Sequence, residues 1–321
     1  PATPAEIERM GELLDEAMEA GCIGLSTGLA YPTAIEAPTE EVTELTRRAA
    51  SHGGIYATHM RNEDERLLDS VDETTRIGRD AGARCVISHH KACGRANWGK
   101  TEESLARIDK ANRDGQAVDF DVYPYTASST VLLAHFVERA EKVLITWSTP
   151  HPEVAGEELT GIAERWKCSI DDAVVKLQPA GAIYFQMDEA DLRRVLRHPG
   201  SMVGSDGIPH DEHPHPRLWG TFPRVLGHYA RDEGLFSMEE AVYKMTGLTA
   251  RVFGLKDRGN IAPGYFADLV LFNQDEVIDR ADFLAPTTPS AGIERVMVNG
   301  QTVWQDGAPS GKRPGGVLRR E

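Results

Sequence analysis

The sequence contains few cysteines, and their spacing excludes the usual sites that are built from cysteine. The 321 residues include Cys22, Cys85, Cys93 and Cys168, which match neither a disulfide framework nor the paired cysteines of a structural zinc site. Cys22 and Cys85 open strand-like runs, so we expect both to be small, buried hydrophobic residues. This cysteine usage favours a reducing compartment, and we predict a cytoplasmic protein.

The sequence also lacks long apolar runs and an excess of positive charge. No stretch approaches the roughly 20 apolar residues that cross a bilayer, and no signal peptide is visible. The net charge is −15, so the chain repels nucleic acid and anionic membranes, and we expect neither as a partner. A small anionic substrate would need a local cluster of Arg and Lys side chains.

Three short apolar runs each end in side chains that can bind a metal or carry a proton. They span residues 54–59, 85–90 and 201–206 and end in a histidine, a histidine pair and an aspartate. Each run is short, β-prone and followed by polar residues, which is typical of a buried parallel strand that ends at a site. Two imidazoles and a carboxylate on one face of an α/β barrel indicate metal-assisted hydrolysis.

The rest of the pattern alternates helices with strands. The spacing of apolar residues predicts helices over 4–19, 39–50, 67–81, 102–113 and 189–197, and further strands over 22–26, 117–123 and 182–187. This order predicts a parallel sheet with right-handed crossovers, and therefore a barrel. About six barrel-type strands are present where a (β/α)₈ barrel needs eight. We therefore expect the first strands to lie upstream of Pro1, which is not an initiator Met.

Two segments depart from this alternation. Near 126–180 we expect an insertion with helices, which could serve as a lid. After Phe253 the chain changes to turns and strands, and the Asn-Gly pair at 299–300 is typical of a β-hairpin turn. We predict two domains: a partial barrel over 1–253, and the C-terminal part of a small β-sandwich over 254–321.

Each histidine motif has a structural alternative to metal binding. Taken alone, His59 is more often a helix-capping or hydrogen-bonded core histidine than a metal ligand. Of the adjacent His89 and His90, only one can face a site, because neighbouring strand residues point to opposite faces. Lys91 lies on the face of His89, which would place a cation beside a ligand, although a plain surface cluster is an equal alternative.

The aspartate and a later histidine pair are also open to two interpretations. Asp206 precedes a glycine, so it is either a turn residue or a general base that acts on a metal-bound water. His213 and His215 have the His-x-His spacing of a metal pair. Because they lie in a proline-rich loop and not at a strand end, we favour a role other than direct ligation.

Together these motifs resemble the amidohydrolase superfamily and, within it, the N-acyl-D-amino-acid deacylase (D-aminoacylase) branch. The matching segments are 24–29, 56–61, 87–91, 122–125, 204–207 and 215–217, and the segment 258–268 resembles the superfamily's return to a β-sandwich. The resemblance runs over nearly the whole chain. It implies a zinc-dependent hydrolase, with one or two zinc ions or another divalent metal, that cleaves the amide bond of N-acyl-D-amino acids.

The resemblance also implies roles for individual residues. His59 and His89 would be zinc ligands, and Asp206 would be the catalytic acid and base. The substrate carboxylate would be held by Lys91, Tyr123 and Arg217, and Arg217 is suited to a bidentate grip. Ser129 and Arg139 are candidates for contacting the substrate side chain, and an arginine there would favour an acidic residue such as D-glutamate.

One departure from the family pattern is large. The His-x-His pair of the first barrel strand has no match in this sequence, and none of the four cysteines lies where the branch has its cysteine ligand. The resemblance therefore implies a fragment, roughly the second two-thirds of a family member. Two histidines and an aspartate alone would bind zinc poorly.

Two further functions remain open from the sequence. A cyclic-amide hydrolase of the dihydroorotase or hydantoinase type would share the fold, and a carboxylated lysine between two metals would favour it. No lysine follows the expected strand at 22–26, which counts against this type. A non-catalytic barrel that binds a carboxylated metabolite is the third hypothesis, and an intact Asp206 argues against it.

Overall fold

The computed structural model describes residues 1–320, and its largest sheet is parallel. The strand order is β1-β2-β3-β4-β8, with β1 (Gly24–Gly28), β2 (Ile55–His59), β3 (Cys85–Ile87), β4 (Val118–Val122) and β8 (Ser201–Val203). Every neighbouring pair in this sheet is parallel. All five strands therefore present their carboxyl ends at one edge, where the three polar strand ends were predicted.

Helices connect these strands and cover the sheet. α1 (Pro4–Glu19) precedes β1, and the helices that follow within this layer are α2 (Thr39–Ser51), α3 (Leu67–Ala81), α4 (Thr101–Arg113) and α8 (Glu189–Arg197). The predicted bounds agree with these to within one residue. Local capping explains the agreement, because Thr3 caps α1 in a reciprocal pair with Glu6, and Gly82 ends α3 in the left-handed conformation with φ 71°.

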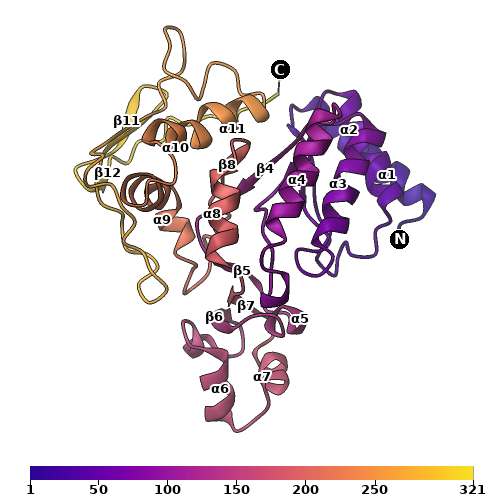
Figure 1. The fold of residues 1–321 in the computed structure, drawn as a ribbon, viewed down its shortest axis with the longest axis vertical. Coiled ribbons are helices and arrows are strands. Elements are labelled where there is room, and N and C mark those ends of the chain that lie inside the picture. Colours follow the sequence, from indigo (N-terminus) through magenta and orange to yellow (C-terminus); the bar gives the residue numbers. More distant parts are fainter. Residues whose placement is uncertain (321) are drawn as a thin grey trace.

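A separate lobe follows β4. Figure 1 shows it projecting from the bottom of the molecule. It contains an antiparallel sheet of order β5-β7-β6 and three helices: β5 (Ala127–Val131), α5 (Ala134–Val137), β6 (Lys142–Ser148), α6 (Leu159–Trp166), α7 (Ile170–Leu177) and β7 (Ala180–Phe185), with a 3₁₀ turn at Pro152–Val154. The insertion predicted near 126–180 is therefore present, but strands as well as helices build it.

The prediction of a barrel strand at 182–187 was wrong, because β7 is the central strand of the lobe. Tyr184 packs on one face of this strand with the lobe helices, and Ile183 packs on the other with Leu144 and Phe283. A strand buried on both faces has the same continuous apolar pattern as a barrel strand. The described chain therefore has five parallel barrel-type strands, where about six were expected.

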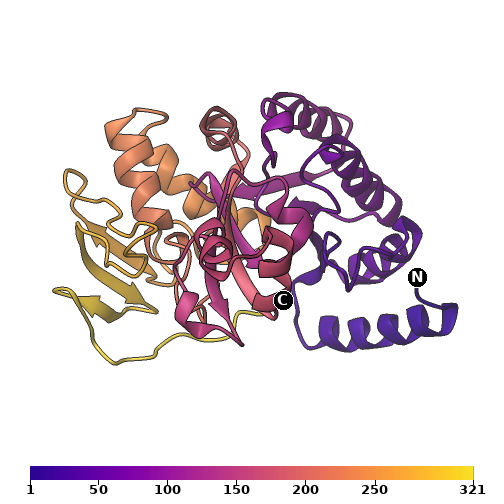
Figure 2. The same cartoon turned by 90° about the horizontal axis from the view of Figure 1, so that it is seen from below.

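The C-terminal third packs beside the far end of the parallel sheet (Figures 1 and 2). Its helices are α9 (Arg217–Arg224), a π-helical continuation (Val225–Asp232), α10 (Met238–Met245) and α11 (Gly247–Val252). An antiparallel sheet of order β12-β11-β10-β9 follows, with β9 (Leu269–Phe272), β10 (Ile293–Val298), β11 (Gln301–Gln305) and β12 (Ala308–Pro309). Asn299 and Gly300 turn between β10 and β11 with φ of 47° and 77°, as the sequence predicted.

Two further predictions concern the burial of the cysteines and the lack of long apolar segments. Cys85 is fully buried, but Cys22 is exposed, because it lies in the turn between α1 and the first residue of β1. The prediction for Cys22 was therefore wrong. Among residues 1–320, none of the helices combines the length and the apolar character that crossing a membrane requires.

Candidate active site

Two histidines meet at the carboxyl edge of the parallel sheet. His59 is the last residue of β2, and His89 follows the end of β3 by two residues. Their ring centroids lie 4.5 Å apart. The backbone N–H of His89 donates to a carboxylate oxygen of Asp121 on β4 at 3.0 Å, which holds His89 in the left-handed region with φ 42°. Such strained backbone is concentrated at functional sites.

A buried glutamate lies between the two rings. Glu63 Oε2 is 3.7 Å from His59 Nε2, and Glu63 Oε1 is 3.1 Å from His89 Nδ1. Ligand-capable atoms of all three residues lie within 4.8 Å of one another. Glu63 was not among the residues that the sequence motifs predicted for the site. Its place four residues after His59 was the only available signal, because it lies in a loop without periodic pattern.

This donor set is suited to a divalent metal such as zinc. Imidazole nitrogens and carboxylate oxygens are ordinary zinc ligands, and a histidine must be neutral to bind. Burial lowers the pKa of His59 to about 4, so its ring stays neutral near pH 7. The residues present therefore fit a metal on chemical grounds.

Lys91 is buried beside this group and directs its donors into the protein. Its Nζ lies 2.6 Å from Glu63 Oε1, 2.6 Å from His89 Nδ1 and 2.8 Å from the carbonyl oxygen of His89. Burial opposes the negative charge of Glu63, but Lys91 and the two histidines outweigh it and hold the pKa of Glu63 well below its usual range. Lys91 is thus engaged by the metal-capable group and does not stand free in the cavity.

Asp206 and Arg217 form an ion pair on the other side of the site. Asp206 follows β8 with φ 46°, and its carboxylate is 2.8 Å from Nη1 of Arg217 at the start of α9. The guanidinium of Arg217 lies 4.5 Å from the centre of the Tyr123 ring, and its Nη2 donates to the carbonyl oxygen of Ser129 at 3.0 Å. Arg217 is buried, whereas the Asp206 side chain is 43% exposed, so water reaches the carboxylate.

A cavity of about 100 Å³ joins the strand ends to the lobe. All the predicted site residues except Arg217 line it: His59, His89, Lys91, Tyr123, Ser129, Arg139 and Asp206. Tyr31, whose ring lies 4.9 Å from that of His59, and several lobe residues complete the wall. Arg217 does not line the cavity itself, but it contacts Asp206, which does. The structure thus brings the predicted residues together around one space.

The cavity wall near the lobe carries one arginine that is held in an ion pair and two hydroxyls without hydrogen-bond partners. Arg139 forms an ion pair with Asp64, and its Nε donates to Gln186 at 2.9 Å. Ser129 Oγ and the hydroxyl of Tyr123 are buried without a hydrogen-bond partner in the described structure. Buried polar atoms ordinarily have partners, so two such groups beside a cavity are suited to a bound ligand.

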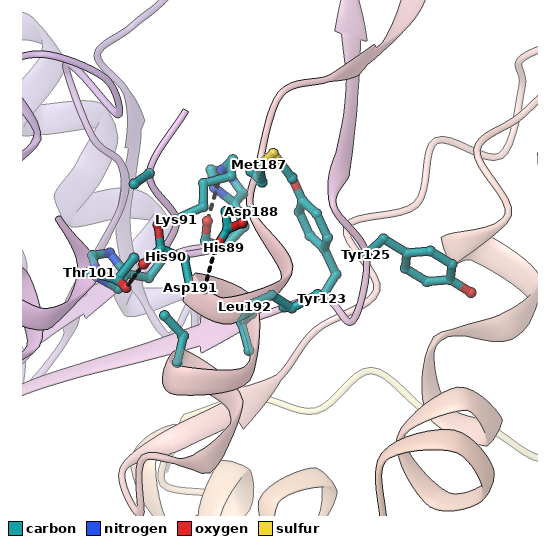
Figure 3. A pocket seen from close by; sticks show the side chains of 13 residues that line it. His89, His90, Lys91, Thr101, Tyr123, Tyr125, Met187, Asp188, Asp191 and Leu192 are labelled. Atoms are coloured by element: carbon teal, nitrogen blue, oxygen red, sulfur yellow. Dashed lines mark hydrogen bonds between the residues drawn. The ribbon is translucent and has the colours of Figure 1, made fainter. Parts of the chain in front are cut away.

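Only one member of the histidine pair faces the cavity, as predicted. His90 Nε2 lies 2.8 Å from the hydroxyl of Ser104 on α4, and the ring packs against Phe120. Figure 3 shows the ring of His90 beside Thr101, away from Tyr123. His90 therefore belongs to the layer between sheet and helices.

The His-x-His pair of the proline-rich loop lies outside the metal-capable group. His213 Nε2 is 2.8 Å from the carbonyl oxygen of Phe283. His215 uses both ring nitrogens, with Nε2 3.0 Å from the carbonyl oxygen of Ala127 and Nδ1 accepting from the backbone N–H of Arg217 at 3.0 Å. These bonds fix the loop and the start of α9, so the pair has a structural role.

Comparison with known proteins identifies relatives that belong to one family. The Amidohydrolase family matches residues 171–304. The chain is 53% identical over 319 residues to a D-aminoacylase and 50% identical over 316 residues to an N-acyl-D-glutamate deacylase, both from Alcaligenes xylosoxydans xylosoxydans. These alignments cover 99% and 98% of this chain but 66% and 64% of the relatives. The chain thus spans slightly less than two-thirds of their length.

Solved structures agree with these relatives. A D-aminoacylase described as defining a novel subset of amidohydrolases superposes with a TM-score of 0.96 at 52% identity, covering 99% of this chain and 67% of that one. N-acyl-D-glutamate deacylase from Bordetella bronchiseptica, complexed with zinc and a phosphonate mimic of the tetrahedral intermediate, has a TM-score of 0.96 at 48% identity with the same coverage. A D-hydantoinase is 16% identical with a TM-score of 0.59, covering 98% of this chain and 71% of that one, and shares the fold.

The parallel sheet with histidines at adjacent strand ends defines an amidohydrolase barrel of the (β/α)₈ type. Within this class, the identities near 50% over almost the whole chain are decisive. The chain belongs to the N-acyl-D-amino-acid deacylase (D-aminoacylase) branch of the amidohydrolase family.

Proposed function

We propose that the protein containing this chain hydrolyses the amide bond of N-acyl-D-amino acids, releasing a D-amino acid and a carboxylate. The observation that carries the proposal is the meeting of His59, His89 and Asp206 around one cavity, with Arg217 directly beside Asp206. Ligands for a metal, an exposed carboxylate and a buried cation are the groups that amide hydrolysis of an anionic substrate requires.

His59 and His89 would hold the metal, and zinc is our first choice because a relative was solved with zinc. When bound, zinc supplies a Lewis acid that polarises the amide carbonyl and a lowered pKa for water. The protein's contribution is to keep the ring of His59 neutral through burial and to hold the ring of His89 through the contact of its Nδ1 with Glu63. Other divalent metals fit the same donors.

Asp206 would act as general base and then as general acid. The attacking water gives its proton to the Asp206 carboxylate while its oxygen bonds to the amide carbon. The C–N bond then breaks, and the proton passes from Asp206 to the departing nitrogen. The exposure of this side chain and its strained backbone both suit a group that exchanges protons at a cavity wall.

The carboxylate of the substrate would bind beside Tyr123, whose ring centre lies 4.5 Å from the guanidinium of Arg217 and 5.6 Å from Lys91 Nζ. Arg217 is buried and planar, so it can grip a carboxylate through two parallel hydrogen bonds, and the unpaired hydroxyl of Tyr123 can add a third. Lys91 would contribute positive charge from the side of the cavity where it contacts Glu63 and His89. Ser129 and Arg139 would contact the side chain of the substrate, and Arg139 favours an acidic one.

The test is an assay on the complete protein. Acetate or formate release is measured from a panel of N-acyl-D- and N-acyl-L-amino acids, with and without added zinc. We expect activity on the D series that depends on zinc. Turnover of cyclic amides alone would contradict the proposal.

We also propose a cytoplasmic location, which the four free cysteines support.

A further inference from the structure

Asp121 contacts the two strand ends that carry the proposed chemistry, although it does not line the cavity itself. It lies on β4, and the alternation of side chains along a strand places it on the same face as Tyr123, which does line the cavity. Its carboxylate accepts the backbone N–H of His89 at 3.0 Å, and its carbonyl oxygen accepts the backbone N–H of His90 at 2.7 Å. The turn after β3 is thus bound at two points to one residue of the neighbouring strand.

The bond from the Asp121 carboxylate fixes the backbone direction of His89. This residue has φ 42°, a conformation that residues other than glycine adopt at a cost. His89 is buried, so its N–H would have no partner without the carboxylate, and an unpaired buried N–H is unfavourable. We expect the turn to relax toward ordinary φ values in that case. The ring of His89 would then leave its place beside His59.

The same carboxylate packs against the end of β8. A methyl group built on Gly204 would lie 2.9 Å from Asp121 Oδ1 and 3.4 Å from its Cγ, and the third nearest atom also belongs to Asp121. Because His89 holds Oδ1, the carboxylate cannot move away without breaking that bond. The backbone N–H of Gly204 donates to the carbonyl oxygen of Val122 at 3.1 Å. The chain therefore passes close to Asp121 two residues before it reaches Asp206.

We propose that Asp121 is a positioning residue that fixes His89 and Asp206 relative to each other. It acts as a hydrogen-bond acceptor toward one strand end and as a packing surface toward the other, and it does not touch the substrate. The inference rests on the proposed function in assigning His89 to a metal and Asp206 to proton transfer. Both groups must meet the same amide bond, so their separation decides the rate of turnover.

The first test compares two substitutions of Asp121 in the complete protein. Asp121→Ala removes the acceptor, and we expect kcat to fall about 100-fold with little change in KM. Zinc affinity, measured by competition with a chelator in the absence of substrate, should fall roughly 10- to 100-fold. Asp121→Asn keeps an oxygen acceptor and removes the charge, so it should recover most of both quantities. Thermal denaturation monitors the folding of each variant.

Asp119→Ala is the matched control. Asp119 lies on the same strand and the same face, two residues nearer the amino end, and it pairs with Arg84 away from the cavity. Its loss should leave kcat and zinc affinity unchanged. An equal loss in this variant would show that any weakening of β4 impairs the site, which would overturn the inference.

The second test uses Gly204. Gly204→Ala should lower kcat in the wild-type background, because the added methyl presses on the held carboxylate. In the Asp121→Ala background the same substitution should have no further effect, since the atoms that it meets are gone. Such non-additivity is expected only of residues in contact. Additive effects would contradict a shared contact.

Three further results decide the inference. Unchanged kcat and zinc affinity in Asp121→Ala would overturn it, and so would an Asp121→Asn variant that is no better than Asp121→Ala, because charge would then matter and geometry would not. If Asp121→Ala does not fold, near-normal values in Asp121→Asn together with the loss in Gly204→Ala support the inference, and a defective Asp121→Asn contradicts it. A wild-type protein that binds zinc but releases no acyl group would refute the proposed function, and zinc affinity alone would then test Asp121.

Discussion

The barrel edge and the lobe contribute different kinds of residue to the same cavity. The barrel contributes His59 at the end of β2, His89 just after β3 and Asp206 just after β8. The two histidine rings contact each other, and Asp206 lines the other side of the same cavity. The lobe contributes hydroxyl, amide and aromatic side chains together with Arg139, whose charge Asp64 already balances. Each region has its own hydrophobic core.

This difference indicates a division of labour. β2 and β3, which position His59 and His89, each pair with a strand on both sides, and β8, which precedes Asp206, pairs with β4. Such a sheet holds side chains at the strand ends precisely enough for metal binding and proton transfer. The lobe is an independent layer that closes the cavity and can vary without disturbing that geometry. We therefore expect substitutions at the barrel edge to alter turnover, and substitutions in the lobe to alter the preference for substrates.

Asp206→Asn should have the largest effect. The variant cannot accept a proton from water, so turnover should fall roughly 10²- to 10⁴-fold, the range of general acid–base catalysis. Zinc content, measured by mass spectrometry, should stay at the wild-type level. Retained turnover would remove Asp206 from the proposed role and weaken the contrast between the two regions.

Arg217→Ala should mainly raise KM. Loss of a buried, charge-assisted contact costs about 2–5 kcal/mol, which corresponds to a rise of roughly 30-fold or more. Arg224→Ala is the matched control, because Arg224 also lies on α9 and packs over a tyrosine ring, that of Tyr125, at 5.1 Å. Equal KM values for the two variants would show that Arg217 does not grip the substrate.

Arg139→Met tests the lobe. We expect kcat/KM for an N-acyl-D-glutamate to fall roughly 10-fold, or about 1.4 kcal/mol. Arg139 is mostly buried, but Asp64 already offsets part of its charge. Values for an N-acyl-D-leucine should change little, and Arg139→Lys should retain part of the preference. A large loss on both substrates would place Arg139 in the reaction and contradict the division of labour.

The last prediction concerns stability rather than activity, and it tests the pH dependence of folding on the barrel side. Burial lowers the pKa of His90 to about 4, whereas its unfolded value is near 6.5. Between these values the unfolded chain binds a proton that the folded chain does not, so the free energy of unfolding should decrease as the pH falls from about 6.5 to 4. The slope from this residue is about 1.4 kcal/mol per pH unit. Urea denaturation of His90→Gln should show a shallower slope, and an identical slope would assign the effect elsewhere.

Local sequence was a good guide wherever one face or one cap decided the structure. The helices at α1, α3 and α8 begin and end where their apolar spacing and capping residues indicated. The pattern failed for β7, because burial on both faces gives the same apolar run in a lobe as in a barrel. It also failed for Cys22, whose place in a turn two residues before β1 decides its exposure.

The candidate site was predictable in composition but not in its connections. His59, His89 and Asp206 could be recognised because each ends a strand-like run. Glu63 and Asp121 could not, since their importance comes from contacts with His89, which is 26 and 32 residues away along the chain. Such contacts depend on the packing of different strands and loops.

The sequence by itself determined the alternation of strands and helices and the chemical groups at the strand ends, because backbone propensity and side-chain periodicity act over a few residues. Only the tertiary structure decided that Lys91 faces Glu63, that Arg217 pairs with Asp206, and that the lobe closes the cavity with Ser129. The physical reason is that burial makes an unpaired charge costly, so each buried group takes the partner that the folded chain brings within reach.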